Sequence, residues 1–485
     1  MELVFPRVDF LLLAPIITVS VTGFLVLIFD LLLSKEKKHL LAYIGLAGLG
    51  VVVISSVALW GENTASLNGM VLTDNFAIFF NLVFSVIAGL SLLLSVRYIR
   101  EMGINYGEYY ALIIFSTLGM MVMGMAGDLL MVFLGMELLS VPIYILAGFL
   151  KRDARSNEAA LKYFLLGAFS AAFLLYGIAL IYGAAGTTNI EGIARFASGP
   201  GALKNPFLLM GMGLIIIGLG FKVALVPFHM WTPDAYEGAP VAVTAFMSVA
   251  PKAAGFAVFL RVLLVALPSA RADWLIIISV LAVLTMTLGN VAAIAQTNIK
   301  RMLAYSSIAH AGYILVALVA GDEMGGSAVL FYLLVYSLMN LGAFGIVILL
   351  VTGGEERSRL SDFAGLATSH PVAAAAMALF MLSLTGIPPT AGFVGKFYLF
   401  SAAVNAGFIW LAIIAVLNSA VSVYYYLRVI IIMYMSEASS VERPLILSPS
   451  SVIALVLAAA GTLALGLYPT FFLGLAQESI KALLG

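Results

Sequence analysis

Residues 206–240 read PFLLMGMGLIIIGLGFKVALVPFHMWTPDAYEGAP, and this stretch decides the fold. It is long and apolar enough to cross a membrane, yet it contains Lys222 and, five residues later, Pro227. A proline inside a helix removes a backbone hydrogen bond and clashes with the preceding turn. Lipid offers the freed carbonyl no replacement partner. The stretch therefore predicts a broken transmembrane helix with an ionisable side chain beside the break.

Lys222 lies nine residues from the near end of this span at Trp231, which corresponds to about 13 Å of helix. A charged lysine at that depth costs at least about 2.5–3.5 kcal/mol unless it faces a polar interior. One interpretation is a lysine that snorkels to the membrane surface. The interpretation that we favour is a relay for protons or ions.

The composition of the whole chain is that of a membrane protein. Of its 485 residues, 63% are hydrophobic and 10% are charged, with a mean hydropathy of +1.12. The net charge of zero gives no reason to expect a nucleic-acid partner, and the absence of cysteine excludes disulfides and iron–sulfur clusters held by this chain. The first residues lack the basic segment of a signal peptide.

Fourteen apolar segments of helical length follow one another along the chain, and the runs are too long and too uniform for strands. Their approximate bounds are 10–33, 40–60, 75–96, 109–126, 129–150, 158–184, 206–230, 241–266, 274–295, 303–320, 327–351, 372–403, 408–435 and 451–470. We therefore predict an all-α integral membrane protein of about fourteen transmembrane helices.

The seventh and twelfth segments are interrupted by Pro or Gly-Pro and hold corresponding places in two sets of five. Because five is odd, the second set would run inverted, as in many transporters. The predicted units are residues 1–108 (helices 1–3), 109–266 (helices 4–8), 274–435 (helices 9–13) and 451–485 (helix 14 and a tail).

Lysine and arginine in the short loops predict the orientation of the chain. One set of loops holds Lys35, Lys37, Lys38, Arg97, Arg100, Lys151, Arg152, Arg155, Lys300, Arg301, Arg357, Arg359 and Arg443; the opposite set holds Arg7, Arg195, Lys204, Arg271 and Lys481. The richer set should face the cytoplasm, which would place both termini outside.

Five ionisable residues fall near the middle of different spans: Glu137, Lys222, Lys252, His310 and Lys396. If the spans form a bundle, these side chains could lie in one row at one depth, which suits charge transfer in the plane of the membrane. Burial disfavours a charged lysine, whereas a neighbouring carboxylate favours it. A Glu137–Lys222 pair would therefore hold a proton when associated and release it when separated.

Each of these positions has a plainer interpretation. Lys252 could be tied structurally to a backbone carbonyl, and His310 could be a packing histidine bonded to Ser306 or Ser307. Glu158 and Lys162 share a helix face four residues apart and could be an ion pair at the membrane surface. His229, near the cytoplasmic face, is equally well explained as structural or functional, and Arg261 and Arg428 are expected to snorkel.

The two helix breaks should be hinges that line hydrated, polar pockets, since unpaired carbonyls inside the membrane are tolerated only there. They are marked by Pro227 in the seventh segment and by Gly386, Pro388 and Pro389 in the twelfth. The sequence contains no GxGxxG after a strand, no GxxxxGK[ST] and no HExxH. We therefore expect this chain to bind no nicotinamide, flavin, nucleotide or metal.

Three motifs resemble the antiporter-like subunits of respiratory complex I and of Mrp-type cation/proton antiporters. They are GLGFKVALVPFHMWTPDAYEGAPVAVTAFM, QTNIKRMLAYSSIAHAGY and SLTGIPPTAGFVGKFY, and the resemblance runs from about the third span to the thirteenth. Within this family the chain is most similar to the N subunits of the bacterial enzyme. Lys252 stands where the L and M subunits usually carry histidine, no long lateral helix follows the last span, and the first motif is close to the N version.

The resemblance implies roles for individual residues. Glu137 would pair with Lys222, Lys252 would be the connecting group, Lys396 would lie on the exit side and Lys162 near the input side. His310 matches a motif of the tenth helix whose role is less settled.

The resemblance also implies a function, which is proton translocation in the membrane arm of NADH:quinone oxidoreductase in the bacterial inner membrane. NADH, flavin, iron–sulfur clusters and quinone would be bound by partner subunits, and the neighbours of this chain would be other membrane-arm subunits. Three alternatives stay open: a component of an Mrp-type Na⁺/H⁺ antiporter, a subunit of a related complex with another electron donor, and a structural subunit that moves no protons.

Overall fold

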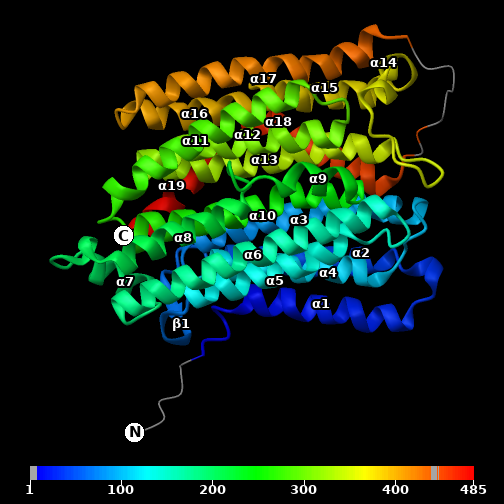
Figure 1. Ribbon diagram of the computed structural model, residues 1–485. Helices are drawn as coiled ribbons and strands as arrows, with labels where there is room; N and C mark the ends of the chain where they lie inside the picture. The colour runs from blue at the N-terminus through cyan, green and yellow to red at the C-terminus, as the bar shows by residue number, and fades with distance from the viewer. Residues whose placement is uncertain (1–7, 438–444, 446) are drawn as a thin grey trace.

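Long helices lie roughly side by side in a single bundle (Figure 1). This computed structural model describes residues 8–437, 445 and 447–485. Arg7 and Arg443, which contributed to the predicted orientation, lie outside the described residues.

The described helices fall into the four groups expected along the chain. The first group holds α1 (Ala14–Leu32), α2 (Leu40–Ala58) and α3 (Asn75–Glu101); the second holds α4 (Gly107–Gly124), α5 (Leu129–Ala147), α6 (Ala154–Ala185), α7 (Ile190–Ala197), α8 (Pro206–Lys222), α9 (Trp231–Gly238) and α10 (Val241–Leu260). The third holds α11 (Arg271–Ile294), α12 (Ile299–Ala320), α13 (Glu323–Leu349), α14 (Leu366–Ser369), α15 (Pro371–Thr385), α16 (Ala391–Asn405) and α17 (Ile409–Met435); the last holds α18 (Pro449–Leu467) and α19 (Thr470–Leu484).

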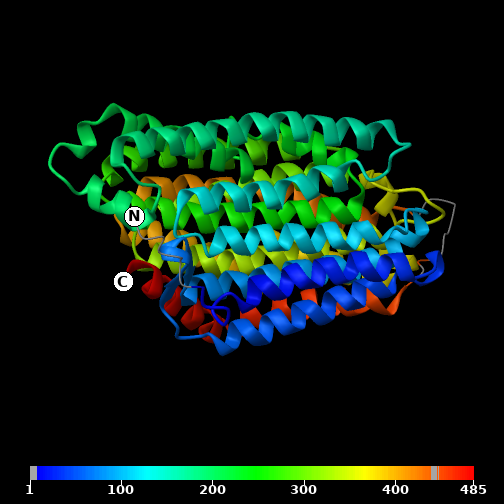
Figure 2. The ribbon, with the colours of Figure 1, turned by 90° about the horizontal axis from the view of Figure 1, so that it is seen from below.

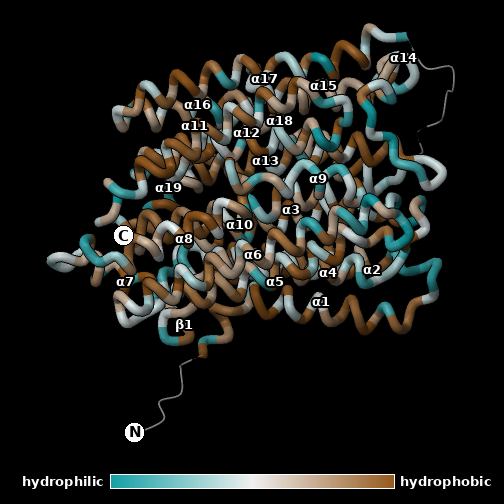
Figure 3. The backbone as a smooth tube through the Cα atoms, viewed as in Figure 1, coloured by the Kyte–Doolittle hydropathy of each residue, from teal (hydrophilic) through white to brown (hydrophobic). Residues whose placement is uncertain are grey.

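Helix starts follow ordinary capping chemistry. The carboxylate of Asp128 accepts a hydrogen bond from the backbone of Leu130 at the start of α5, and Asn298 caps α12 in the same way. Proline occupies the first turn of α8 and of α15, where its missing N–H costs nothing. Polar residues gather mainly at the two ends of the bundle, and hydrophobic residues cover most of the helix length (Figure 3).

Twelve helices of the described chain are long and apolar enough to cross a membrane. The predicted count of fourteen is therefore not reached by single helices. The seventh and twelfth predicted segments are instead split into α8 with α9 and α15 with α16, and both breaks contain a cis peptide bond before a proline. Fourteen crossings result only if each split pair counts as one, which stays a prediction.

The prediction that the chain has no strands was wrong. A short antiparallel hairpin, β1 (Thr64–Ser66) and β2 (Val71–Thr73), lies between α2 and α3, with Thr64 opposite Thr73. It falls in a polar connection between two predicted spans, where hydropathy carries no information about backbone pairing. The predicted tail after the last span also has structure, because it forms α19, which packs with α18 against α3 (Figure 2).

Three helices form the centre of the bundle. The candidate span formed by α10 and the π-helical turn Arg261–Ala266 has 94% of its most apolar window buried, and α12 and α13 reach the same value. Those of α1, α2 and α18 are only 33% buried. The central helices therefore meet other helices on nearly all sides, which allows them to carry polar side chains.

Candidate functional site

The first helix break places Lys222 at the end of a half-helix. α8 ends at Lys222 and α9 begins at Trp231, with Ala224 in the left-handed region at φ 62°. The break satisfies several of its backbone groups with protein partners. The Trp231 indole donates to the Phe221 carbonyl at 3.0 Å, and the Val226 N–H donates to the Thr285 hydroxyl at 3.0 Å.

Lys222 is buried, and neutral hydroxyls surround its ammonium group. Its Nζ donates to Ser140 Oγ at 2.6 Å and to Tyr144 OH at 3.1 Å, both on α5. Glu137 lies one turn before Ser140 on the same helix, and its buried Oε1 has no hydrogen-bond partner. No Glu137–Lys222 ion pair occurs in the described part of the chain. The expected partners are therefore neighbours but are not in contact as a pair.

Lys252 connects the first set of helices to the second. It follows Pro251 in α10 and is buried, and its Nζ donates to both the carbonyl and the hydroxyl oxygen of Ser307 on α12. The bond to the carbonyl matches the structural tether considered from the sequence. The second bond, to the hydroxyl, adds a group that can both accept and donate a proton.

His310 lies one helical turn beyond Ser307 and is buried between two tyrosines. Its Nδ1 is 2.6 Å from Tyr332 OH, and its Nε2 is 2.9 Å from Tyr426 OH. Tyr426 also hydrogen-bonds Ser306. The expectation that Ser306 or Ser307 would bond His310 directly was therefore wrong, because tyrosines from α13 and α17 occupy that place.

The second helix break positions Lys396. Gly386 has φ 92°, which favours glycine, and a Cβ there would lie 3.0 Å from Lys396 Cδ. The Lys396 Nζ donates to the carbonyl of Thr385, the last residue of α15, at 2.9 Å and to Ser419 Oγ at 3.0 Å. The neighbouring Gly395 packs against Tyr332, so Lys396 lies close to the tyrosine that bonds His310.

The buried basic residues thus follow one another across the bundle, each with hydroxyl partners from a neighbouring helix. We name this set, with Glu137, the central row: Glu137, Lys222, Lys252, His310 and Lys396. The hydroxyls were missed in the sequence, because serine and tyrosine are inexpensive to bury and carry no signal of their own. The positions of Ser140 and Tyr144 three and seven residues after Glu137 could have marked them as one helix face.

Lys162 lies at the end of the bundle rather than in the central row. Its side chain is 43% exposed, and its Nζ is 2.7 Å from Glu158 Oε1 and 2.7 Å from Asp234 Oδ2. Arg301 in turn pairs with Asp234 at 2.7 Å and with Glu237 at 3.0 Å. The predicted Glu158–Lys162 pair is present, but it belongs to a larger charged cluster that the sequence did not reveal.

The prolines of both breaks point away from the lysines. Pro227, Pro388 and Pro389 are exposed, whereas Lys222 and Lys396 are buried. The cavity beside Pro227, of about 270 Å³, is lined almost wholly by apolar side chains, so the expected polar pocket does not lie on this side. His229 is half-buried in the first break. No group of three or more potential metal ligands occurs in the residues described.

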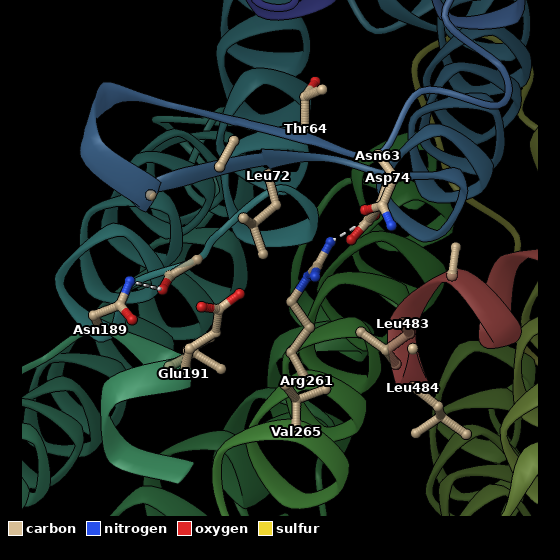
Figure 4. Close-up of a pocket in the computed structure, with 16 residues that line it drawn as sticks. Asn63, Thr64, Leu72, Asp74, Asn189, Glu191, Arg261, Val265, Leu483 and Leu484 are labelled. Carbon is tan, nitrogen blue, oxygen red and sulfur yellow. Dashed lines mark hydrogen bonds and ion pairs between the residues drawn. The ribbon is translucent and has the colours of Figure 1, made fainter. Parts of the chain in front are cut away.

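Arg261 does not snorkel, as the sequence had suggested. It is buried at the end of α10 and pairs with Asp74 at 2.9 Å, while its Nε donates to the Gly124 carbonyl (Figure 4). Its guanidinium also lies 4.7 Å from the Phe76 ring centroid. Arg428, the other arginine expected to snorkel, donates to two backbone carbonyls.

A cavity of about 350 Å³ adjoins the Arg261–Asp74 pair at this end of the bundle. Figure 4 shows residues of the hairpin, of α7 and of α19 around it. The pair therefore ties α10 to α3 at a place where four parts of the chain meet.

Comparisons with known proteins agree with this architecture. The family model described as NADH:quinone oxidoreductase/Mrp antiporter, TM, matches residues 126–422. A relative from Trichlorobacter lovleyi, named NADH-quinone oxidoreductase subunit N, is 50% identical over 98% of each chain.

Two solved structures have the same fold. A chain in respiratory complex I from Thermus thermophilus is 36% identical, with a TM-score of 0.81 over 95% of this chain and 98% of that one. A chain of the Mrp complex from Dietzia is 24% identical, with a TM-score of 0.84 over 98% of this chain and 100% of that one, and shows the fold alone. The chain therefore belongs to the NADH:quinone oxidoreductase/Mrp antiporter family of transmembrane subunits.

Proposed function

We propose that this chain is an N-type membrane-arm subunit of bacterial NADH:quinone oxidoreductase that translocates protons through the central row. The single observation that carries the proposal is the sequence of buried lysines and histidine, each hydrogen-bonded to hydroxyls of adjacent helices. Buried ionisable residues are costly in a membrane protein and usually mark an ion pathway. A purely structural subunit would gain nothing from them.

Proton transfer along the row would use the lysines as sites of protonation and the hydroxyls as bridges. A hydroxyl accepts a hydrogen bond from a charged lysine and can donate one to a neutral lysine. Lys222 on hydroxyls, with Glu137 Oε1 unpartnered, is the arrangement expected when the proposed pair is separated. Closure of that pair would favour the charged lysine, and its opening would favour release of the proton.

The ends of the pathway follow from the same arrangement. Lys162, in the exposed charged cluster, would serve the input side, and Lys396, beside the second break, would serve the exit side. Pro227 and the segment with Gly386, Pro388 and Pro389 would act as hinges. Glu158 and His229 would contribute to the input side without a place in the central row.

Electron transfer from NADH to quinone would take place in partner subunits, which would hold the flavin, the iron–sulfur clusters and the quinone. This chain would contact other membrane-arm subunits and supply the pathway alone. We further propose that residues 109–266 and 274–435 are inverted repeats, flanked by units 1–108 and 451–485, and that both termini face outward from the bacterial inner membrane.

The decisive experiment is proton pumping by the assembled complex in proteoliposomes. Lys222→Ala and Glu137→Ala should abolish or severely reduce pumping while the complex still assembles. Lys222→Arg should also fail, because a guanidinium does not release its proton in proteins. Lys204→Ala, which changes an exposed lysine, is the control and should pump normally.

Normal pumping by Lys222→Arg would contradict proton release at this residue. The shared fold with the Mrp chain supports one second function, antiport of Na⁺ and H⁺. Transport of ²²Na⁺ by the same vesicles, abolished by Lys222→Ala, would favour that function over proton translocation alone.

A further inference from the structure

Glu356 is a mostly buried carboxylate on the connection between α13 and α15, outside the central row. Its Oε1 accepts hydrogen bonds from Tyr98 OH at 2.5 Å and from the Val241 N–H at 2.7 Å. Its Oε2 pairs with Lys300 Nζ at 2.8 Å, and Lys300 is itself buried. Three separate helices therefore converge on one carboxylate.

These partners belong to parts of the chain that are distant in sequence. Tyr98 lies near the end of α3, Val241 is the first residue of α10, and Lys300 lies in the first turn of α12. The first N–H groups of a helix have no partner within it, and a negative charge there is stabilised by the helix dipole. Glu356 therefore caps α10 and at the same time fixes α12 beside it.

A second bond at this place strengthens the connection between the same two helices. Lys300 Nζ also donates to the carbonyl of Ala239 at 2.6 Å, two residues before α10 begins. The carboxylate of Glu356 compensates the buried charge of Lys300, which would otherwise be costly. Glu356 and Lys300 together set the position of the α10 start relative to α12.

The same two helices form the crossing of the central row. Lys252 lies eleven residues into α10 from Val241, and Ser307 lies seven residues along α12 from Lys300, which correspond to about 16 Å and about 10 Å of helix. Pro251 interrupts the hydrogen bonding of α10 just before Lys252. The start of α10 can therefore tilt at Pro251, and such a tilt would move Lys252 relative to Ser307.

We propose that Glu356 is a positioning residue that holds α10 against α12 and thereby keeps Lys252 Nζ on Ser307. This rests on the proposed function, since it assigns Glu356 a role in proton passage across that contact. Glu356 does not itself carry protons in this proposal. It acts through the helix that carries Lys252.

The test compares Glu356→Gln with Glu355→Gln in the assembled complex. Glutamine keeps an acceptor for Tyr98 and Val241 but removes the charge that holds Lys300, whereas Glu355 is exposed and adjacent. We expect Glu356→Gln to reduce the protons pumped per electron roughly tenfold, the scale of one lost charge-assisted hydrogen bond. Electron transfer by the assembled complex should continue, and Glu355→Gln should pump normally.

A merely structural role would lower the amount of assembled complex, and the complex that remained would pump with a normal ratio of protons to electrons. That result, or unchanged pumping, would overturn the proposal. If Glu356→Gln prevents assembly, Tyr98→Phe removes one bond to the same carboxylate and should lower the ratio several-fold. An unchanged ratio in Tyr98→Phe would then overturn the proposal.

Lys252→Ala separates failure of this inference from failure of the proposed function. If Lys252→Ala pumps normally, the central row does not carry protons and both proposals fail. If Lys252→Ala stops pumping while Glu356→Gln pumps normally, only the positioning role of Glu356 fails.

Discussion

The lysines of the central row are held by neutral hydroxyls and carbonyls rather than by carboxylates. Lys222, Lys252 and Lys396 each contact at least one serine hydroxyl, and none forms an ion pair within the described residues. A buried ion pair would fix the charge on its lysine, because separating the partners is costly. Hydroxyl partners accept both the charged and the neutral lysine, so protonation can change without a large rearrangement.

Tyr426→Phe tests the hydroxyl bridge between His310 and Ser306. The change removes one hydroxyl and leaves both partners buried, which should lower the free energy of unfolding by about 1–3 kcal/mol. Pumping should fall several-fold in proteoliposomes. Tyr424→Phe, at an exposed neighbouring position, is the matched control; equal pumping by the two variants would exclude a role for the bridge.

At the residue scale, the sequence predicted the costly groups and missed the inexpensive ones. Lys222, Lys252 and Lys396 were identifiable because a lysine at mid-span demands an explanation. Glu356 and Asp74 were not, because each lies in or beside a polar connection where carboxylates are common. Their importance depends on which helices the fold brings to them, and hydropathy does not contain that information.

The two broken helices use the same chemical arrangement. In each, a half-helix ends beside a lysine: α8 ends at Lys222 itself, and the last carbonyl of α15 accepts a bond from Lys396. A cation at a helix C-terminus is stabilised by the unpaired carbonyls and the dipole. The breaks therefore supply acceptors that a continuous helix would have used internally.

Gly386→Ala should disturb the second break. Alanine would be strained at φ 92°, and its Cβ would meet Lys396 Cδ at 3.0 Å, so we expect a loss of about 1–2 kcal/mol of stability together with reduced pumping. Thermal unfolding of the purified complex and a pumping assay measure the two effects. Gly183→Ala, within α6 and with open space around it, should leave both unchanged; a similar loss there would contradict this explanation.

At the scale of elements, the apolar runs and the two interruptions were correctly predicted, but the short elements between spans were not. The β1–β2 hairpin, α7 and α19 are stabilised by contacts with helix ends, as in the bond from the Leu72 N–H to the Met125 carbonyl. Such contacts depend on tertiary structure, and the sequence of the short segment alone does not specify them.

The whole molecule is organised around α10, which is anchored at both ends by buried charges. Glu356 and Lys300 hold its start, and Asp74 pairs with Arg261 at its far end. The anchors come from the connection after α13, from α12 and from the cap of α3, so the first three helices and both sets of five are tied to this helix. Movement of α10 as a whole is thereby restricted to changes that preserve both ends.

Asp74→Ala should destabilise the far anchor. The change leaves Arg261 buried without its carboxylate and removes the side-chain cap of α3, and breaking a buried pair in this way costs about 3–5 kcal/mol. We expect less assembled complex and a lower unfolding temperature in detergent. Glu62→Ala removes an exposed carboxylate nearby in sequence and should have little effect; comparable stability of the two variants would show that the anchor is dispensable.

The contact between Lys252 and Ser307 spans 55 residues of sequence, and this has a consequence for how the chain enters the membrane. During synthesis α10 leaves the ribosome well before α12, so its lysine has no hydroxyl to bind when the helix first meets lipid. Exposure of that lysine would cost at least about 2.5–3.5 kcal/mol. We therefore expect the insertion machinery to retain α10 in a polar environment until α12 arrives, and to release the central helices into the bilayer together.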